Sequence, residues 1–148
     1  MTNAIRVHEY GGPEVMRFEG VDVGEPGPLE VRVKQQACGL NYIDVYHRTG
    51  FYPQPALPFV LGAEGAGDVV AVGADVSDFS IGDRVAYGSV IGGYAEERLI
   101  AADRLVKLPD EISYETAAAM MLQGMTARYL LKKTFPVKAG DTILYQAA

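Results

Sequence analysis

The sequence predicts a mainly β, barrel-like domain that is followed by a helix and the beginning of a different fold. Before Pro109, short apolar or alternating runs are separated by turns rich in glycine and proline, which is typical of all-β barrels. After Pro109, alanine, methionine and leucine dominate Ala117–Leu131, a composition that favours a helix. Thr142–Tyr145 then predicts one further strand.

Strands are expected where β-branched and aromatic residues alternate or cluster between turn signals. The clearest is Glu30–Ala37, which places Val31, Val33 and Gln35 on one face of a half-buried antiparallel strand. The others are Ile5–Tyr10, Val15–Val23, Val69–Val72, Arg84–Tyr87, Gly93–Ile100 and Leu105–Leu108.

The glycine-rich stretch Gly62–Gly73 allows two interpretations. Phosphate-binding loops follow a strand and open a helix, whereas these glycines lead into a strand, so close packing is favoured over phosphate binding. Glu64 lies within this stretch, where a carboxylate is costly unless it is paired or hydrogen-bonded. We therefore expect Glu64 to be a structural carboxylate.

Two helices are expected. The first covers Asn41–Arg48, with Asn41 as its cap and Gly50 at its end. Ser113 caps the second, and Gly124 is expected to kink or break it. The methionines of the second helix are expected to fill the core rather than form a specialised site. They are Met120, Met121 and Met125.

Composition excludes several classes of function. With 148 residues, 49% of them apolar, the chain can form one domain with a real core, or one domain and a fragment of another. A formal net charge of −6 argues against nucleic acid or an anionic membrane as partner, and a cytoplasmic location is the default. The single cysteine, Cys38, excludes an internal disulfide, and we expect it to be a small core residue rather than a nucleophile.

Six motifs occur in an order that resembles the zinc-independent quinone oxidoreductase (zeta-crystallin-like) branch of the medium-chain dehydrogenase/reductase superfamily. They are Gly11–Val15, Asn41–Tyr46, Arg48–Pro53, the Glu64 stretch, Gly82–Val85 and Gln123–Ala127. The resemblance covers essentially the whole chain. It implies a GroES-like catalytic domain over residues 1–112, followed by a connecting helix and the start of a truncated nucleotide-binding Rossmann domain over 113–148.

The resemblance also concerns metal binding. In the zinc-dependent relatives, the catalytic zinc ligands fall where this sequence has Asn41, Ala63 and Leu122. None of these side chains is a ligand that zinc selects, and one cysteine cannot form a four-cysteine structural site. No metal is therefore expected.

A metal-free member of this branch would transfer hydride from NADPH to a quinone or similar electron-poor alkene or carbonyl. The resemblance assigns catalytic roles to Asn41, Tyr46 and Tyr52, and places Asn41, Tyr46, Gln123 and Thr126 near the cofactor. Each has a plainer alternative. Asn41 can be only a helix cap, the tyrosines can be packing residues, and Thr126 can bond back within its helix. Asp44, His8 and His47 are expected to have no chemical role.

The main nucleotide site would lie beyond Ala148, so this chain alone is expected to be an inactive fragment of an enzyme that is a homodimer. A complete domain ending in a short edge strand is the alternative. Two other functions also stay open: reduction of an enoyl thioester, and a non-catalytic binding or structural role.

Overall fold

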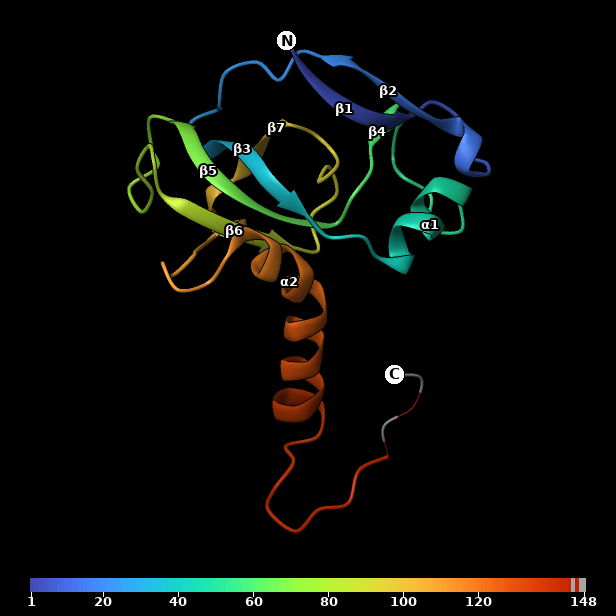
Figure 1. The fold of residues 1–148 in the computed structure, drawn as a ribbon, viewed down its shortest axis with the longest axis vertical. Helices are drawn as coiled ribbons and strands as arrows, with labels where there is room; N and C mark the ends of the chain where they lie inside the picture. Colours follow the sequence, from blue (N-terminus) through green and yellow to red (C-terminus); the bar gives the residue numbers. More distant parts are fainter. Residues whose placement is uncertain (145, 147–148) are drawn as a thin grey trace.

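The computed structural model describes residues 1–144 and residue 146. Its strands form two antiparallel sheets, ordered β2-β1-β4 and β7-β3-β5-β6-β8 (Figure 1). The strands are β1 (Thr2–Val7), β2 (Met16–Val21), β3 (Glu30–Cys38), β4 (Phe59–Val60), β5 (Glu64–Val72), β6 (Arg84–Gly88), β7 (Glu97–Ala101) and β8 (Val106–Lys107). The predicted mainly β architecture is confirmed.

β5 lies at the centre of the larger sheet, paired with β3 on one side and β6 on the other. It begins at Glu64, so Gly65 and Gly67 are part of the strand itself, whereas Gly62 precedes it and Gly73 follows it. A Cβ on Gly67 would come within 2.9 Å of the Gln35 Cα, and the β3–β5 register shifts between Gln35 and Ala37. The glycines therefore allow close strand packing, as predicted, and the phosphate-loop alternative is wrong.

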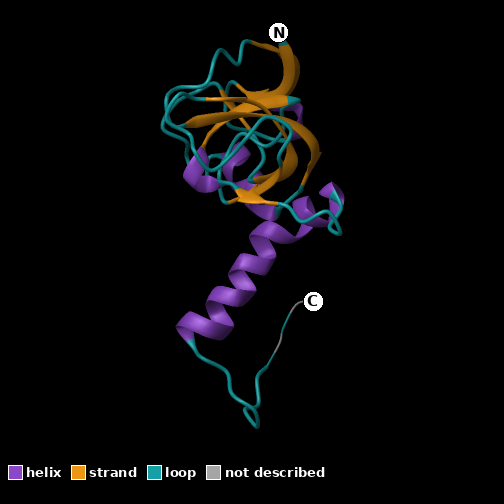
Figure 2. Cartoon of the chain, turned by 90° about the vertical axis from the view of Figure 1, so that its left-hand side faces the viewer, coloured by secondary structure: helices purple, strands orange, loops and turns teal. Residues whose placement is uncertain are grey.

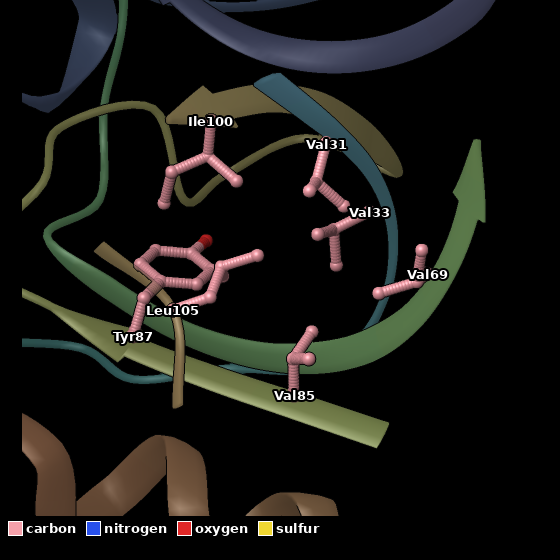
Figure 3. Close-up of a cluster of buried hydrophobic side chains, with 7 residues drawn as sticks. All are labelled: Val31, Val33, Val69, Val85, Tyr87, Ile100 and Leu105. Atoms are coloured by element: carbon pink, nitrogen blue, oxygen red, sulfur yellow. The ribbon is translucent and has the colours of Figure 1, made fainter. Parts of the chain in front are cut away.

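The main core cluster fills the inside of the larger sheet (Figure 3). Val31 and Val33 are fully buried, which confirms the alternation predicted for β3. Tyr87 is also fully buried, and its hydroxyl donates to Gln35 Oε1 at 2.9 Å. That bond satisfies the one polar group that a tyrosine brings into an apolar core.

Both helices begin where predicted. α1 (Tyr42–Thr49) follows Asn41 and ends at Gly50, whose φ of +80° is a conformation that glycine adopts without strain. α2 (Tyr114–Tyr129) follows Ser113, whose hydroxyl accepts a hydrogen bond from the Thr116 N–H at 3.2 Å. Among the described residues, no helix is long and apolar enough to cross a membrane.

α2 continues through Gly124, so the predicted kink or break is wrong. One glycine costs a helix only about 1 kcal/mol relative to alanine, which flanking residues offset. The first turns of α2 pack through Ala117 and Ala118 onto Ala66 of β5 and Ala86 of β6, where small side chains permit close approach. The helix then extends away from the sheets and ends in a π-type turn, Leu130–Thr134 (Figure 2).

This course changes the interpretation of the methionines. Met121 packs against the alanine cluster, but Met120 and Met125 are 46% and 41% exposed, so the core prediction is wrong for these two. They lie where α2 leaves the barrel and has little to bury against. Cys38 is also exposed rather than in the core, because its side chain lies on the outer face of β3.

Most predicted strands have different bounds. β2 and β8 are shorter at both ends than the predicted Val15–Val23 and Leu105–Leu108, β5 begins before Val69, and β4 was not predicted. β1 ends at Val7, because the following residues turn towards α1, where the Gly11 N–H donates to the Arg48 carbonyl. β7 begins at Glu97, because the Tyr94 N–H is bonded to the Leu61 carbonyl instead. Thr142–Leu144 form no strand, since this segment has no ladder partner among the described residues, and Tyr145 lies outside them.

Candidate functional site

The start of α1 is held by Asp44. Its carboxylate accepts a hydrogen bond from the Asn41 N–H at 2.9 Å and from the Tyr94 hydroxyl at 2.7 Å. Burial and the adjacent Asp44 carboxylate both raise the pKa of Tyr94, so the phenol keeps its proton and remains a donor. Asp44 thus has the structural role that was expected, and it fixes the backbone of Asn41.

The Asn41 side chain points to a second buried carboxylate, Glu64, which is 1% exposed. Asn41 Nδ2 donates to Glu64 Oε1 at 2.7 Å, and the Leu122 N–H of α2 donates to Glu64 Oε2 at 2.6 Å. Gln123 Nε2 in turn donates to Asn41 Oδ1 at 3.1 Å. We call Asn41, Glu64, Leu122 and Gln123 the carboxylate network. It joins α1, β5 and α2, and it confirms that Glu64 is held by hydrogen bonds.

Gly39 makes room for this network. A Cβ at Gly39 would lie 2.6 Å from Glu64 Cγ and closer still to Glu64 Oε1 and the Ala118 carbonyl oxygen. The Gly39 N–H also donates to the Glu64 carbonyl at 3.3 Å. Only a glycine lets the chain after β3 pass between the carboxylate and α2.

The two candidate tyrosines lie together at the outer side of α1. The Tyr46 ring centroid is 5.2 Å from that of Tyr52, and the Tyr52 N–H donates to the Tyr46 carbonyl at 3.1 Å. Tyr42 and Phe51 complete the cluster, at 5.3 and 5.2 Å from Tyr46. Tyr52 is 47% exposed and Tyr46 is half-buried, so Tyr52 in particular is accessible to a ligand.

The last candidate, Thr126, is exposed, and its hydroxyl donates to the Leu122 carbonyl at 2.8 Å. Such a bond back within the helix is the alternative to a cofactor role that the sequence allows for Thr126. The structure therefore joins Asn41 to Gln123 and Tyr46 to Tyr52, but it links Thr126 to these residues only through the helix.

A pocket of about 260 Å³ lies beside the carboxylate network, between α1 and the loop that follows β6. It is lined by Ile43, His47, Gln54, Ala63, Ser89, Ile91 and Leu122. His47 and Ser89 were not predicted as site residues. A lone histidine in a short helix and a serine after a strand carry no motif, so the sequence contained no signal for either. Three larger hollows, of about 510, 520 and 340 Å³, lie elsewhere. Neither they nor this pocket is lined by a predicted site residue.

The positions that hold zinc ligands in zinc-dependent relatives surround the same carboxylate. Asn41 and Leu122 bond to Glu64, and Ala63 precedes it. Both Glu64 oxygens face N–H donors, and amide, methyl and isobutyl side chains are not the ligands that zinc selects. Within the described residues, no three side chains of histidine, cysteine, aspartate or glutamate group together as they would around a metal ion.

The chain matches known proteins over its whole length. Residues 27–110 match the family described as "Alcohol dehydrogenase GroES-like domain". A quinone oxidoreductase from Pseudomonas aeruginosa is 51% identical over 149 aligned residues, which cover 100% of this chain and 46% of that protein. A 2-haloacrylate reductase from a Burkholderia species is 43% identical, with the same coverage.

A solved structure of Escherichia coli quinone oxidoreductase complexed with NADPH superposes with a TM-score of 0.89. It is 43% identical, over 92% of this chain and 42% of that one. The chain thus spans about half the length of the curated relatives that it matches. The likeness extends through α2 as well as the barrel.

Proposed function

The chain belongs to the alcohol dehydrogenase GroES-like domain family, and from this premise we propose that it forms the N-terminal part of an NADPH-dependent quinone oxidoreductase. Its homology to quinone oxidoreductases runs through the whole chain, and one such relative was solved with NADPH. In this proposal residues 1–112 are the catalytic domain. The segment 113–148 begins the nucleotide-binding domain, a boundary supported by the cap at Ser113.

The observation that carries the proposal is the hydrogen bond between Asn41 and Gln123 within the carboxylate network. It brings a residue proposed for catalysis against a residue proposed for cofactor binding, although the two are far apart in sequence. Asn41, Tyr46, Gln123 and Thr126 would border the nicotinamide. NADPH supplies the hydride when bound, and the task left to the protein is to orient the reactants and stabilise developing charge.

Tyr46 and Tyr52 suit the second part of that task. A phenol donates a hydrogen bond without titrating near pH 7, so it can face an oxygen that becomes negative as hydride arrives. We propose that Tyr52, the more exposed of the two, faces the substrate, with Tyr46 beside it. The buried Asn41 would lie at the inner end of the substrate site. No zinc step is part of the proposal, because the residues at the ligand positions do not suit the metal.

The test uses the complete protein that contains this chain. We expect NADPH oxidation that depends on added quinone, and no stoichiometric zinc by metal analysis. Tyr52→Phe should lower kcat at least about tenfold, because a donor to the developing charge is lost. Tyr42→Phe is the matched control, since Tyr42 belongs to the same aromatic cluster and should keep normal turnover. Stoichiometric zinc, or no turnover of any quinone or enone, would contradict the proposal.

Reduction of a conjugated alkene is a second candidate, favoured by the likeness to a 2-haloacrylate reductase. The same donors would then stabilise charge on the carbonyl or carboxylate oxygen of the alkene. The ratio of kcat/KM for a quinone and for an enoyl thioester or a haloacrylate separates the two candidates. A preference of tenfold or more for the alkene would favour the second.

A non-catalytic role predicts different behaviour. If the chain is a binding module, the complete protein should bind its partner and leave NADPH unoxidised. The enzyme proposal instead predicts that the 148-residue chain, studied alone, shows no NADPH binding by fluorescence titration. Tight binding there would mean that the cofactor site is wrongly placed.

We also propose that the complete protein is a cytoplasmic homodimer. Size measurement by light scattering on the complete protein tests the oligomeric state.

A further inference from the structure

The pocket beside the carboxylate network has the composition of a small-ligand subsite. Ile43, Ala63 and Leu122 contribute apolar walls, and His47 and Ser89 contribute polar groups. Ligand sites are characteristically apolar with a few placed polar groups, and about 260 Å³ is enough for part of a ligand rather than a large one. Ala63 precedes Glu64 and the Leu122 N–H donates to it, so the pocket adjoins the carboxylate network.

His47 borders this pocket without a hydrogen bond. Its Nδ1 atom is fully buried and has no partner among the described residues. Buried polar atoms are nearly always bonded, so an unpaired one needs an explanation. Burial lowers the pKa of His47, against a smaller opposing effect of Asp44, and this favours the neutral imidazole, which carries one N–H donor. Because Nδ1 is enclosed by protein, a ligand in the pocket would meet the other ring nitrogen, Nε2, which is not enclosed and has no hydrogen bond to a described residue. An oxygen of such a ligand would accept the Nε2–H of the neutral ring.

Ser89 is held in a conformation that serine rarely adopts. Its φ is +62°, and it is the single non-glycine residue with a positive φ in the described part of the chain. The loop is fixed there by hydrogen bonds from the Val90 N–H to the Ala63 carbonyl, 3.2 Å, and from the Gly92 N–H to the Gly62 carbonyl, 2.9 Å. Backbone strain of this kind concentrates at functional sites, and here it sets a hydroxyl group at the same pocket as His47.

We propose that this pocket binds the carbonyl oxygen of a quinone that is remote from the reacting end, with His47 as the donor and Ser89 beside it. The proposal rests on the proposed function and adds a residue that distinguishes substrates. A quinone has two carbonyl groups across its ring, whereas a simple enone has one. An enone held at the reaction site would leave His47 unpaired, so His47 favours the quinone.

The first test compares duroquinone with 2-cyclohexenone as substrates of the complete protein. Duroquinone is chosen because its ring carbons are fully methylated and do not alkylate the exposed Cys38 thiol. In His47→Leu, kcat/KM for duroquinone should fall about tenfold, the value of one good hydrogen bond. For cyclohexenone it should change less than twofold. His47→Gln keeps a donor and should recover most of the loss.

The matched control is His8→Leu, the same change at the other histidine of the chain, which pairs with Glu19 away from the pocket. It should leave both substrates unaffected. Equal losses for the two substrates in His47→Leu, or no loss for duroquinone, would overturn the proposal. Equal losses would mean that His47 only supports the fold.

A second test does not depend on turnover. Adding duroquinone to the protein labelled with ¹⁵N-histidine, without NADPH, should shift the His47 ring nitrogen resonances and leave those of His8 in place. No shift at saturating duroquinone would overturn the subsite. A protein that shows the shift but oxidises no NADPH would instead contradict the proposed function and support the subsite, so the two failures are distinguishable.

Discussion

Replacing Glu64 by glutamine tests the carboxylate network with little change of shape. Glu64 is 1% exposed, and its two oxygens accept hydrogen bonds of 2.7 Å from Asn41 Nδ2 and 2.6 Å from the Leu122 N–H. A glutamine has one oxygen and one NH₂ group. Whichever way its amide turns, an N–H group then faces another N–H donor.

The expected cost follows from these two contacts. One hydrogen bond survives but loses its charge, at about 1 kcal/mol, and the other donor is left buried and unpaired, at about 1–3 kcal/mol. Removing the buried charge returns part of that loss. We expect the free energy of unfolding to fall by about 2 kcal/mol, which for a domain of this size lowers Tm by about 4–8 °C.

A second substitution should restore the network. In Asn41→Asp with Glu64→Gln, the carboxylate moves to position 41, where one oxygen accepts from the new glutamine and the other from Gln123 Nε2. The glutamine oxygen then accepts from the Leu122 N–H, and aspartate is as good a helix cap as asparagine. We expect the double variant to regain at least about 1 kcal/mol relative to Glu64→Gln alone.

Urea unfolding of the wild type, the two single variants and the double variant measures this coupling directly. Asn41→Asp alone should be the least stable, because it buries two carboxylates against each other. Losses in the double variant that merely add would refute the reasoning, since the network would then not be what Glu64 stabilises.

Three further predictions concern stability. Gly39→Ala should lower the free energy of unfolding by about 1–3 kcal/mol, because the added Cβ meets Glu64 and Ala118. Gly20→Ala is the control and should be tolerated, since only Met1 Sδ, at 3.9 Å, lies near the added Cβ. Ser89→Gly should raise the melting temperature or leave it unchanged by relieving the φ of +62°, and a clear loss would show that the Ser89 side chain stabilises the loop. Burial lowers the pKa of His47 from 6.5, so the unfolded chain binds a proton more readily and stability should fall as the pH drops below about 6.5. A flatter pH dependence in His47→Gln, measured by thermal melts, checks this assignment.

Local patterns were sufficient for the mainly β architecture, the starts of both helices and the end of α1, but not for most strand bounds or for Gly124. Val31 and Val33 alternate with polar residues because one face of β3 is buried, and Gly50 ends α1 because its φ is positive. Burial at the end of α2 was not predictable in this way. Whether Met120 and Met125 are covered depends on what packs beside them, which helix composition does not contain.

The same limit applies to the candidate site. The motifs selected Asn41 and Gln123, which do meet, and the expectation that Glu64 is hydrogen-bonded followed from the cost of burying a charge. The contact of Tyr94 with Asp44 joins residues 50 positions apart, and no local pattern records it. The strained φ of Ser89 arises from hydrogen bonds of its loop to Gly62 and Ala63, so it too is visible only in three dimensions.

Gly39, Glu64 and Leu122 together set the direction in which α2 leaves the barrel. A helix lying on small alanines can rotate about its own axis at little steric cost, since their surface is smooth. The bond from the Leu122 N–H to a buried carboxylate restricts this rotation, and Gly39 leaves the space that the carboxylate needs. Any rotation of α2 must therefore pull on Glu64 and, through it, on the Asn41 amide. The orientation of that amide therefore depends on how the outer end of α2 is held.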